Sequence, residues 1–473
     1  MGLIFGSIPG LTATMAIAIC LPITFGMDPG AGMALLMGLY MGGVSGGLIP
    51  AILLKLPGTP SSIATTFDGY PMAQNGQAGK ALGLAIVFSF LGGLLSIAAL
   101  MLIAPPLAKL ALHFGPMEYF AITMLALTLI SSLSDGSIIK GMLGALLGMA
   151  LALVGSAPID SYPRLTFGIS DLNAGFNLLP VLIGLFAVSE IIKISESKVG
   201  SLSGNILIDK IKGFGFSVKE FSGQLWNFLR SSLIGIGIGI LPGIGGGTAN
   251  IVAYAAAKNR SKTPEKFGKG MPDGVVASES SNNAAVGGAL VPLMALGIPG
   301  DTVTAMLIGG LVIHGIQPGP LFFTQNTDIV YGIFAALIIA NIMMIVLLFF
   351  GMRAFINILS VPRHLLLPII IVLCAVGAFA ENNRIFDMGS LLFFGVVGYL
   401  LIKAQFPITP IILGFILGPI AETNLRRGLM ATQGDFLPFL TSPIPLAFWS
   451  VALITVLFKI WKSHKQKGVV IRE

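Results

Sequence analysis

The sequence predicts an all-α polytopic membrane protein, and three observations lead to this fold class. The 473 residues are 55% hydrophobic and only 10% charged, whereas a soluble domain is about 25% charged. Apolar runs long enough to cross a bilayer recur along the chain and predict about ten to twelve membrane elements. Glycine-proline interruptions occur twice within these runs, in two similar sets, which predicts two repeats with broken or re-entrant helices.

The net charge of +7 follows from basic residues that cluster in loops, as the positive-inside rule expects. A nucleic-acid role would need a basic folded face, and the sequence shows none. Cys20 and Cys374 both lie in apolar stretches, which is typical of buried thiols rather than of a disulfide framework. No secretory leader is visible, and so few residues precede Pro9 that we expect the natural chain to begin upstream.

The first half, residues 1–192, opens on the motif Gly6-Ser7-Ile8-Pro9-Gly10. Proline ends a helix by removing a backbone donor, and if the halves form an inverted repeat, Gly6–Phe25 is the matching hairpin that enters from the other face. A second interruption runs from Ile49-Pro50 to Leu56-Pro57-Gly58-Thr59-Pro60. The apolar runs that follow in this half are Leu82–Ala104, Phe120–Leu133, Ile138–Val154 and Leu178–Ile194.

Residues 193–230 form a polar stretch rich in lysine, serine and glycine, which indicates a linker between the halves. A second basic loop runs from Lys258 to Lys269, and residues 459–473 form a basic tail. The positive-inside rule places all three on the cytoplasmic side.

The second half, residues 231–458, begins with the apolar segment Ser231–Ala257, which has basic residues on both flanks. Two full crossings would need about 40 residues, and this segment has 27. We therefore predict a re-entrant hairpin with its tip at Pro242–Thr248. The alternative is one long tilted helix with a glycine-rich packing face.

This half repeats both interruptions, as Gly239-Ile240-Leu241-Pro242-Gly243 and then Val291-Pro292 to Ile298-Pro299-Gly300-Asp301-Thr302. The prolines of the second interruption are seven positions apart in both halves. Inverted repeats are the usual arrangement where sites lie at broken helices, and we favour them over parallel repeats. The remaining apolar runs are Ile329–Phe350, Leu365–Phe379 and Pro445–Phe458.

The four interruptions are the predicted substrate site. A helix that begins inside the membrane exposes N–H groups and the positive end of its dipole, which suits an anion. Serine, threonine and asparagine supply neutral partners there without burying charge. The candidate substrate-binding residues are Pro9, Gly10, Thr12, Thr14, Gly58, Thr59, Ser61, Ser62, Gly243, Gly245, Gly246, Gly247, Thr248 and Asn250.

A cation site is predicted beside the substrate, because neutral oxygens and unwound carbonyls suit sodium and Asp301 would offset its charge. The candidate ion-binding residues are Ser281, Asn282, Asn283, Gly300, Asp301 and Thr302. Sodium is the only metal expected. The polar run Glu279–Asn283 has an alternative role as a helix N-cap at the membrane surface. Asp68 is expected to be a turn residue, with a site role as the alternative.

The sequence contains no metal-ligand spacing, no Ser/His/Asp grouping and no phosphate loop, since Gly245–Thr248 lacks the lysine of that motif. We therefore expect neither an enzyme nor a cofactor. A channel is a third class, but channels usually assemble symmetric pores, whereas paired breaks fit alternating access. A stand-alone ion-coupled organic-anion carrier remains the nearer alternative.

At these motifs the chain resembles the large permease subunit of tripartite tricarboxylate transporters. Nearly the whole chain takes part in the resemblance, except that family members usually carry further residues before the first motif. The stretches that carry it are Pro50–Ser62, Asp68–Ala73, Leu241–Gly246, Pro272–Ala284, Ile298–Asp301 and His314–Pro320.

The resemblance implies a multi-pass protein of the bacterial inner membrane that imports carboxylates by symport, usually with sodium. It also implies two partners, a small membrane subunit and a periplasmic solute-binding protein. Ser280–Asn283 is similar to the Ser-Asn pattern at ion sites of related carboxylate carriers. The lipid bilayer is the other expected partner, and a homo-oligomer is compatible with this class.

Overall fold

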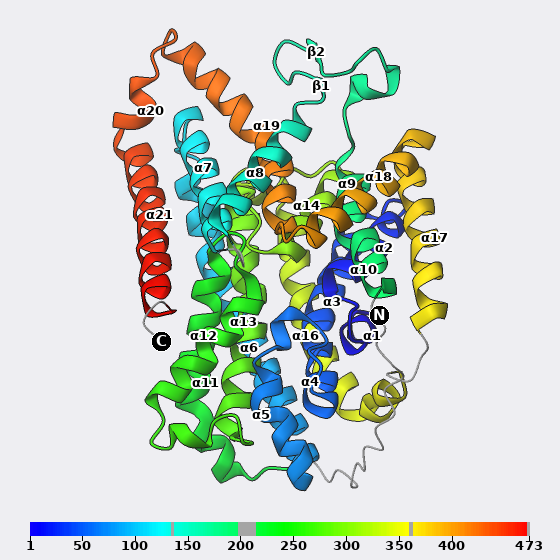
Figure 1. Cartoon of the computed structure of the whole chain (residues 1–473), viewed down its shortest axis with the longest axis vertical. Coiled ribbons are helices and arrows are strands. Elements are labelled where there is room, and N and C mark those ends of the chain that lie inside the picture. Colours follow the sequence, from blue (N-terminus) through cyan, green and yellow to red (C-terminus); the bar gives the residue numbers. More distant parts are fainter. Residues whose placement is uncertain (134–136, 197–213, 359–362, 471–473) are drawn as a thin grey trace.

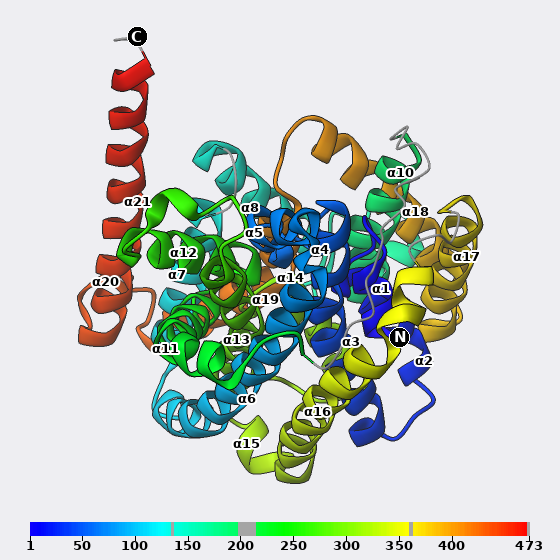
Figure 2. The ribbon, with the colours of Figure 1, turned by 90° about the horizontal axis from the view of Figure 1, so that it is seen from below.

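The computed structural model describes residues 1–133, 137–196, 214–358 and 363–470. These residues are mostly helical and include only one short pair of strands, which confirms the predicted all-α membrane class. Most long helices run roughly along the long axis of the molecule (Figure 1). The C-terminal helix α21 stands at one side of the helical body (Figure 2).

The helices up to the predicted linker are α1 (Gly2–Ser7), α2 (Ala13–Thr24), α3 (Pro29–Gly46), α4 (Leu48–Leu54), η1 (Pro60–Ser62), α5 (Thr65–Met72), η2 (Ala73–Gln77), α6 (Ala78–Ala111), α7 (Pro116–Leu133), α8 (Ile138–Ala152), η3 (Ser170–Ala174), α9 (Leu178–Ile183), η4 (Gly184–Val188) and α10 (Ser189–Glu196). The later helices are α11 (Val218–Ile240), α12 (Gly245–Arg260), η5 (Pro264–Lys266), α13 (Pro272–Leu296), α14 (Thr302–Ile313), α15 (Phe322–Gln325), α16 (Thr327–Ile358), α17 (Arg363–Asn382), α18 (Ile385–Lys403), α19 (Ile408–Ala431), α20 (Leu437–Thr441) and α21 (Pro443–Val470).

Six helical segments within the described residues are long and apolar enough to cross a membrane, and six shorter apolar helices accompany them. The long segments are Pro29–Leu54, Thr65–Ala111, Leu178–Glu196, Thr327–Met352, Ile385–Lys403 and Ile408–Ala431. The chain is therefore a multi-pass membrane protein.

Helix α13 lies at the centre of the fold and is buried along nearly its whole length, from Gly274 to Ala295. Helices α6, α11 and α12 pack around it. Close approach depends on glycine: a Cβ at Gly239 of α11 would lie only 2.6 Å from the carbonyl oxygen of Ala285 in α13. The run Glu279–Asn283 is buried in mid-helix, and the N-cap residue is Met271. The surface-cap interpretation of this run is wrong.

The predicted break after α11 is present, because α11 ends at Ile240 and α12 begins at Gly245. Gly243 and Gly245 adopt φ angles of +77° and +64°, the left-handed region that glycine enters without strain. This break excludes the alternative of one long helix. The first arm begins at Val218, earlier than the predicted hairpin and inside the predicted linker.

The two arms form a hairpin against α13. In the first half of α11, Asn227 Nδ2 donates to the carbonyl oxygen of Asp273, 2.9 Å away. Towards the end of α12, the ring of Tyr254 lies against Gly274. Both arms therefore pass the first turn of α13 partway along their lengths, and the tip of the hairpin reaches the middle of that helix.

We expect single cysteines at Val218 and Asn259, the exposed outer ends of the two arms, to react with an impermeant thiol reagent from the same side of a vesicle. A cysteine at the exposed His113, after the far end of α6, should react from the opposite side. The native Cys20 and Cys374 are buried and should contribute little background. Labelling of Val218 and Asn259 from opposite sides would show that this segment spans the membrane.

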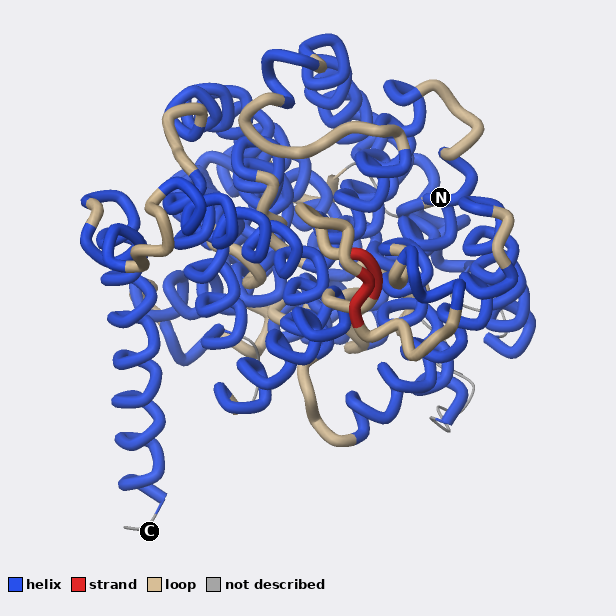
Figure 3. The backbone as a smooth tube through the Cα atoms, turned by 90° about the horizontal axis from the view of Figure 1, so that it is seen from above, coloured by secondary structure: helices blue, strands red, loops and turns tan. Residues whose placement is uncertain are grey.

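One element was not predicted. Residues 155–156 (β1, Gly155–Ser156) and 163–164 (β2, Pro163–Arg164) form a short antiparallel pair, which lies over one end of the helical body (Figure 3). Residues 197–213 of the predicted linker lie outside the described residues. The division into halves at residues 192 and 230 stays a prediction, as does the separate basic tail, where α21 continues to Val470.

Candidate functional site

The second interruptions of the two halves share one backbone geometry. Each follows a helix that ends in a left-handed residue, Lys55 (φ 58°) after α4 and Gly297 (φ 72°) after α13. The N–H group of the next residue donates to the carbonyl oxygen six positions earlier, from Leu56 to Pro50 and from Ile298 to Pro292. Both N···O distances are 3.2 Å. These paired hydrogen bonds satisfy carbonyls that the helix end leaves free.

The residues that restart the helices also match. The Thr59 N–H donates to Ser62 Oγ at 3.3 Å, and the Asp301 N–H donates to Thr304 Oγ1 at 2.8 Å. Both are halves of a capping box, in which the side chain of the third helical residue bonds the N-cap backbone. The two breaks are thus built alike locally, while a symmetry relating the complete halves remains a prediction.

The hairpin tip between α11 and α12 touches both of these breaks. A Cβ at Gly245 would lie 2.8 Å from Asp301 Cβ, and one at Gly246 would lie 2.9 Å from Ser61 Oγ. The Gly243 N–H donates to the carbonyl oxygen of Gly300 at 2.8 Å. The Asn250 amide, on the first turns of α12, donates to the carbonyl oxygen of Ser61.

The first hairpin reaches the same place through Thr14, whose hydroxyl lies 3.3 Å from that of Thr302. As a result, the N-termini of α2, α12 and α14 and the turn η1 meet in one region, although they come from four distant parts of the sequence. Helix α12 has no side-chain N-cap. The first N–H groups of α12 therefore have no side-chain acceptor, and an anion could bind to them without displacing one.

Asp301 is the acid of this region. Its Oδ1 accepts from the N–H and hydroxyl of Thr304, at 2.7 and 2.8 Å, and its Oδ2 accepts from the Tyr40 hydroxyl at 2.6 Å. No basic side chain pairs with it among the described residues. A carboxylate with only neutral donors at membrane depth is a place where a cation would be stabilised.

The predicted ion-binding residues of α13 divide into different roles. The Ser281 hydroxyl bonds the carbonyls of its own helix, at Ala277 and Ser278. Asn283 Oδ1 accepts from Ser45 of α3 at 2.7 Å. Asn282 Oδ1 accepts from the Asn283 amide at 3.1 Å. Their assignment as sodium ligands is still a prediction.

Glu279 was missing from the predicted site set and is the most deeply placed acid of this helix, with no exposed surface. Its carboxyl accepts from Thr65 Oγ1 at 2.5 Å, from Ser89 Oγ at 2.8 Å and from Asn282 Nδ2 at 3.4 Å. No basic residue contacts it among the described residues. The signal available in the sequence was an acid directly beside the Ser-Asn run, in a polar cluster for which we weighed an ion site against a surface cap without naming Glu279 as a ligand.

Several predicted substrate residues pack within or cap the helix breaks and do not face the region where the helix N-termini meet. Thr12 caps α2 by accepting from the Met15 N–H at 3.2 Å. Gly58 packs against Gly6 and Gly47, where a side chain would not fit. Gly10 lies against Ile194. Pro9 is buried at the α1–α2 break, and Gly247 lies against Pro60 near the exposed Thr248.

Two buried oxygens in this region lack a hydrogen-bond partner within the described chain. They are Thr59 Oγ1 and Asn250 Oδ1, and both belong to the predicted substrate set. Buried polar atoms are normally satisfied by protein or by ordered water. These two atoms are therefore available to a bound ion, ligand or water.

Asp68 is neither a turn residue nor part of this region. It lies in α5 and is fully buried. Its Oδ1 accepts from the N–H groups of Gly268, Gly270 and Met271, at 2.8, 2.9 and 2.8 Å, and its Oδ2 accepts from Tyr254 at 2.8 Å. The carboxylate thus holds the turn that leads into α13.

We expect Asp68→Ala to lower the free energy of unfolding by about 3 kcal/mol or more, because several buried donors lose a charged acceptor together. Tyr254→Phe removes one of the four bonds and should cost only about 1 kcal/mol. Thermal unfolding of the two variants in detergent measures the difference. Equal stability of Asp68→Ala and the parent protein would contradict this role.

Broken helices whose N-termini meet inside a multi-pass helical fold are typical of membrane transport proteins. Comparison with known families agrees: the model of the tripartite tricarboxylate transporter TctA family matches residues 1–413. The chain belongs to this family, whose members are the membrane permease subunits of tripartite tricarboxylate transporters.

Two relatives come from Agrobacterium vitis. An uncharacterized 52.8 kDa protein in the TAR-I ttuC' 3' region is 36% identical over 467 residues, which cover 99% of this chain and 92% of the relative. An uncharacterized protein in the TAR-II ttuC' 3' region is 35% identical over 230 residues, covering 49% of this chain and 95% of the relative. No solved structure shows significant similarity to the chain.

Proposed function

We propose that this chain is the permease of a secondary active, sodium-coupled importer of tricarboxylates or related carboxylates. The observation that carries the proposal is the meeting of helix N-termini at the breaks, above all Gly245 and Gly246 of α12 against Asp301 and Ser61. Free N–H groups and helix dipoles favour a carboxylate at the start of α12.

Asp301 supplies a reason for coupling. A carboxylate substrate at the α12 N-terminus would lie close to the Asp301 carboxylate, because Gly245 packs against that side chain. Like charges this close in a low-dielectric site repel strongly. A sodium ion between them would convert repulsion into attraction, so that substrate binds well only when the ion is bound. This is a differential interaction of the kind that any coupling requires.

The predicted ligands of the ion are the Ser281–Asn283 segment and the Gly300–Thr302 break, to which we add Glu279. Hard oxygen donors suit such a cation. Alternating access then requires that the site be reached from one side of the membrane at a time. We place the protein in the bacterial inner membrane, with a small membrane subunit and a periplasmic solute-binding protein as its partners.

Uptake of labelled citrate into proteoliposomes tests the function. With both partner subunits present, we expect accumulation that needs an inward sodium gradient and stops when the gradient is dissipated. Uptake that persists without the partners would favour the stand-alone carrier. Citrate flux that follows only its own gradient, whatever the sodium gradient, would rule out coupled transport.

A further inference from the structure

A cavity of about 1040 Å³ lies at the end of the molecule that carries the β1–β2 pair. Its walls come from the ends of α6 and α8, the loop before α15 and the second half of α19. Leu296 and Gly297 also line it, and they directly precede the break at Pro299–Asp301. The cavity therefore runs from this end of the molecule to the last turn of α13.

The polar groups of the cavity favour an anion. Arg164 and Arg427 line it, together with a single acid, Glu422. Arg164 binds Glu422 through two hydrogen bonds, of 2.6 and 3.1 Å, so this acid is already neutralised. The neutral polar side chains that share the lining are Tyr119, Ser156, Asn173, Gln317, Gln325, Thr423 and Asn424.

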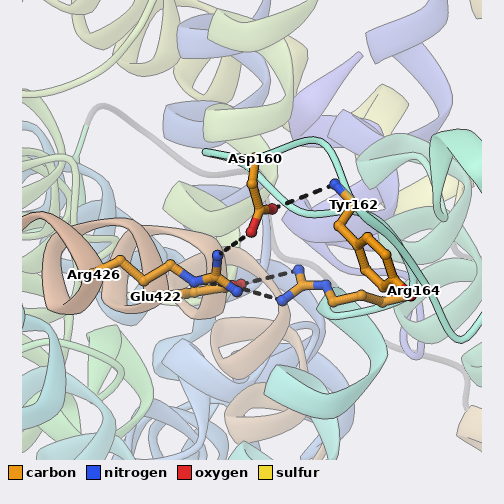
Figure 4. Close-up of polar contacts among 5 residues, drawn as sticks. All are labelled: Asp160, Tyr162, Arg164, Glu422 and Arg426. Atoms are coloured by element: carbon orange, nitrogen blue, oxygen red, sulfur yellow. Dashed lines mark hydrogen bonds and ion pairs between the residues drawn. The ribbon is translucent and has the colours of Figure 1, made fainter.

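A network of ion pairs fixes this side of the cavity (Figure 4). Arg426 Nε lies 3.0 Å from Glu422, and its Nη1 lies 3.1 Å from Asp160 of the β1–β2 loop. The Tyr162 N–H and the Arg426 guanidinium hold the pKa of Asp160 below its usual range. Asp160, Glu422, Arg164 and Arg426 thus bind one another, which ties the loop to α19.

Arg427 takes no part in that network. Arg427 is exposed and borders the cavity, and its guanidinium has no hydrogen-bond or ion-pair partner in the described part of the chain. The Nε of Arg164 is buried without a partner. Guanidinium groups bind carboxylates in a planar, two-bond geometry, and the guanidinium of Arg427 is free to do so.

We propose that this cavity is a binding site for an organic anion with two or more carboxylate groups, in which Arg427 takes one carboxylate and the amide and hydroxyl side chains of the lining take the others. The volume leaves room for a branched molecule much larger than inorganic phosphate. The idea that substrate binds in this cavity before it reaches the breaks rests on the proposed transport function. The proposal that the cavity binds an anion does not rest on that function.

The test uses a cysteine at Thr423, which lines the cavity one helical turn from Arg427 and on the same face of α19. In the purified full chain, an anionic methanethiosulfonate reagent should modify Thr423→Cys faster than a cationic one. Adding Arg427→Gln should lower this rate ratio about tenfold, because one charge acts in opposite directions on the two reagents. Arg427→Lys should keep most of the preference.

Citrate should slow modification of Thr423→Cys, and Arg427→Gln should raise the half-protecting concentration about tenfold. Lys109→Gln is the matched control, since Lys109 is an exposed cation in the last turn of α6 outside the lining. It should change neither quantity. Equal rate ratios with and without Arg427, or protection by inorganic phosphate as strong as by citrate, would overturn the proposal. If citrate protects Thr423→Cys from modification but the protein takes up no citrate, the transport function would be refuted and the anion site would stand.

Discussion

Glu279→Gln is expected to reduce citrate uptake at least about 100-fold while changing the melting temperature little. Glutamine has nearly the same shape, and the Thr65 and Ser89 hydroxyls that now donate to the carboxyl can also accept. The variant therefore removes the charge and keeps the packing. If Glu279 provides negative charge at the ion site, a loss of about 3 kcal/mol corresponds to this factor.

Sodium-driven uptake and thermal unfolding of the same preparation measure both effects. Glu190→Gln is a control, because Glu190 pairs with Lys193 at 3.1 Å on an exposed part of α10. It should leave uptake near the parent value. Full uptake by Glu279→Gln would mean that Glu279 is a neutral hydrogen-bonding residue of the core, outside the coupling mechanism.

Gly246→Leu is expected to abolish uptake while the protein still accumulates in the membrane. Even a Cβ at this position would lie 2.9 Å from Ser61 Oγ and 3.4 Å from the Asn282 carbonyl oxygen. A leucine side chain would fill the space between α12, η1 and α13, where the helix N-termini meet. Gly246→Ala should reduce uptake less, because Ser61 can shift by a few tenths of an ångström.

The matched control is Gly237→Leu, in the same hairpin. Apart from the adjacent backbone of α11 itself, no atom lies within 4 Å of a Cβ at Gly237, which is exposed. Uptake should remain near normal in this variant, since leucine is a good helix former and the position faces outward. Normal uptake by Gly246→Leu would show that no ligand passes or binds at the hairpin tip.

The breaks could be predicted from the sequence because they depend on local chemistry. Proline at position 242 and glycine at 243 and 245 determine where α11 stops and α12 begins, whatever surrounds them. The polar run at Glu279–Asn283 was harder to place, since polar residues before an apolar run also occur at helix starts. Only the packing of α6 and α11 shows that this run is buried.

Contacts between distant segments could not be predicted. Nothing local to Tyr40 or Ser45 indicates that they reach Asp301 and Asn283, which lie more than 200 positions away. The same holds for Asp68, whose partners belong to the turn before α13. Arg427 carries no motif, and its position beside a cavity depends on how α19 crosses the ends of other helices.

The central claim is that α13 and the break at Asp301 form a sodium site, and equilibrium binding of radioactive sodium to the purified permease tests it most directly. Asn282→Ala removes one proposed ligand, and Asp301→Asn removes the charge while keeping a good helix N-cap. We predict saturable sodium binding that weakens about tenfold or more in each variant and is unchanged in Lys109→Gln. Binding that is absent from the parent protein, or that is equally tight in both variants, would contradict the account.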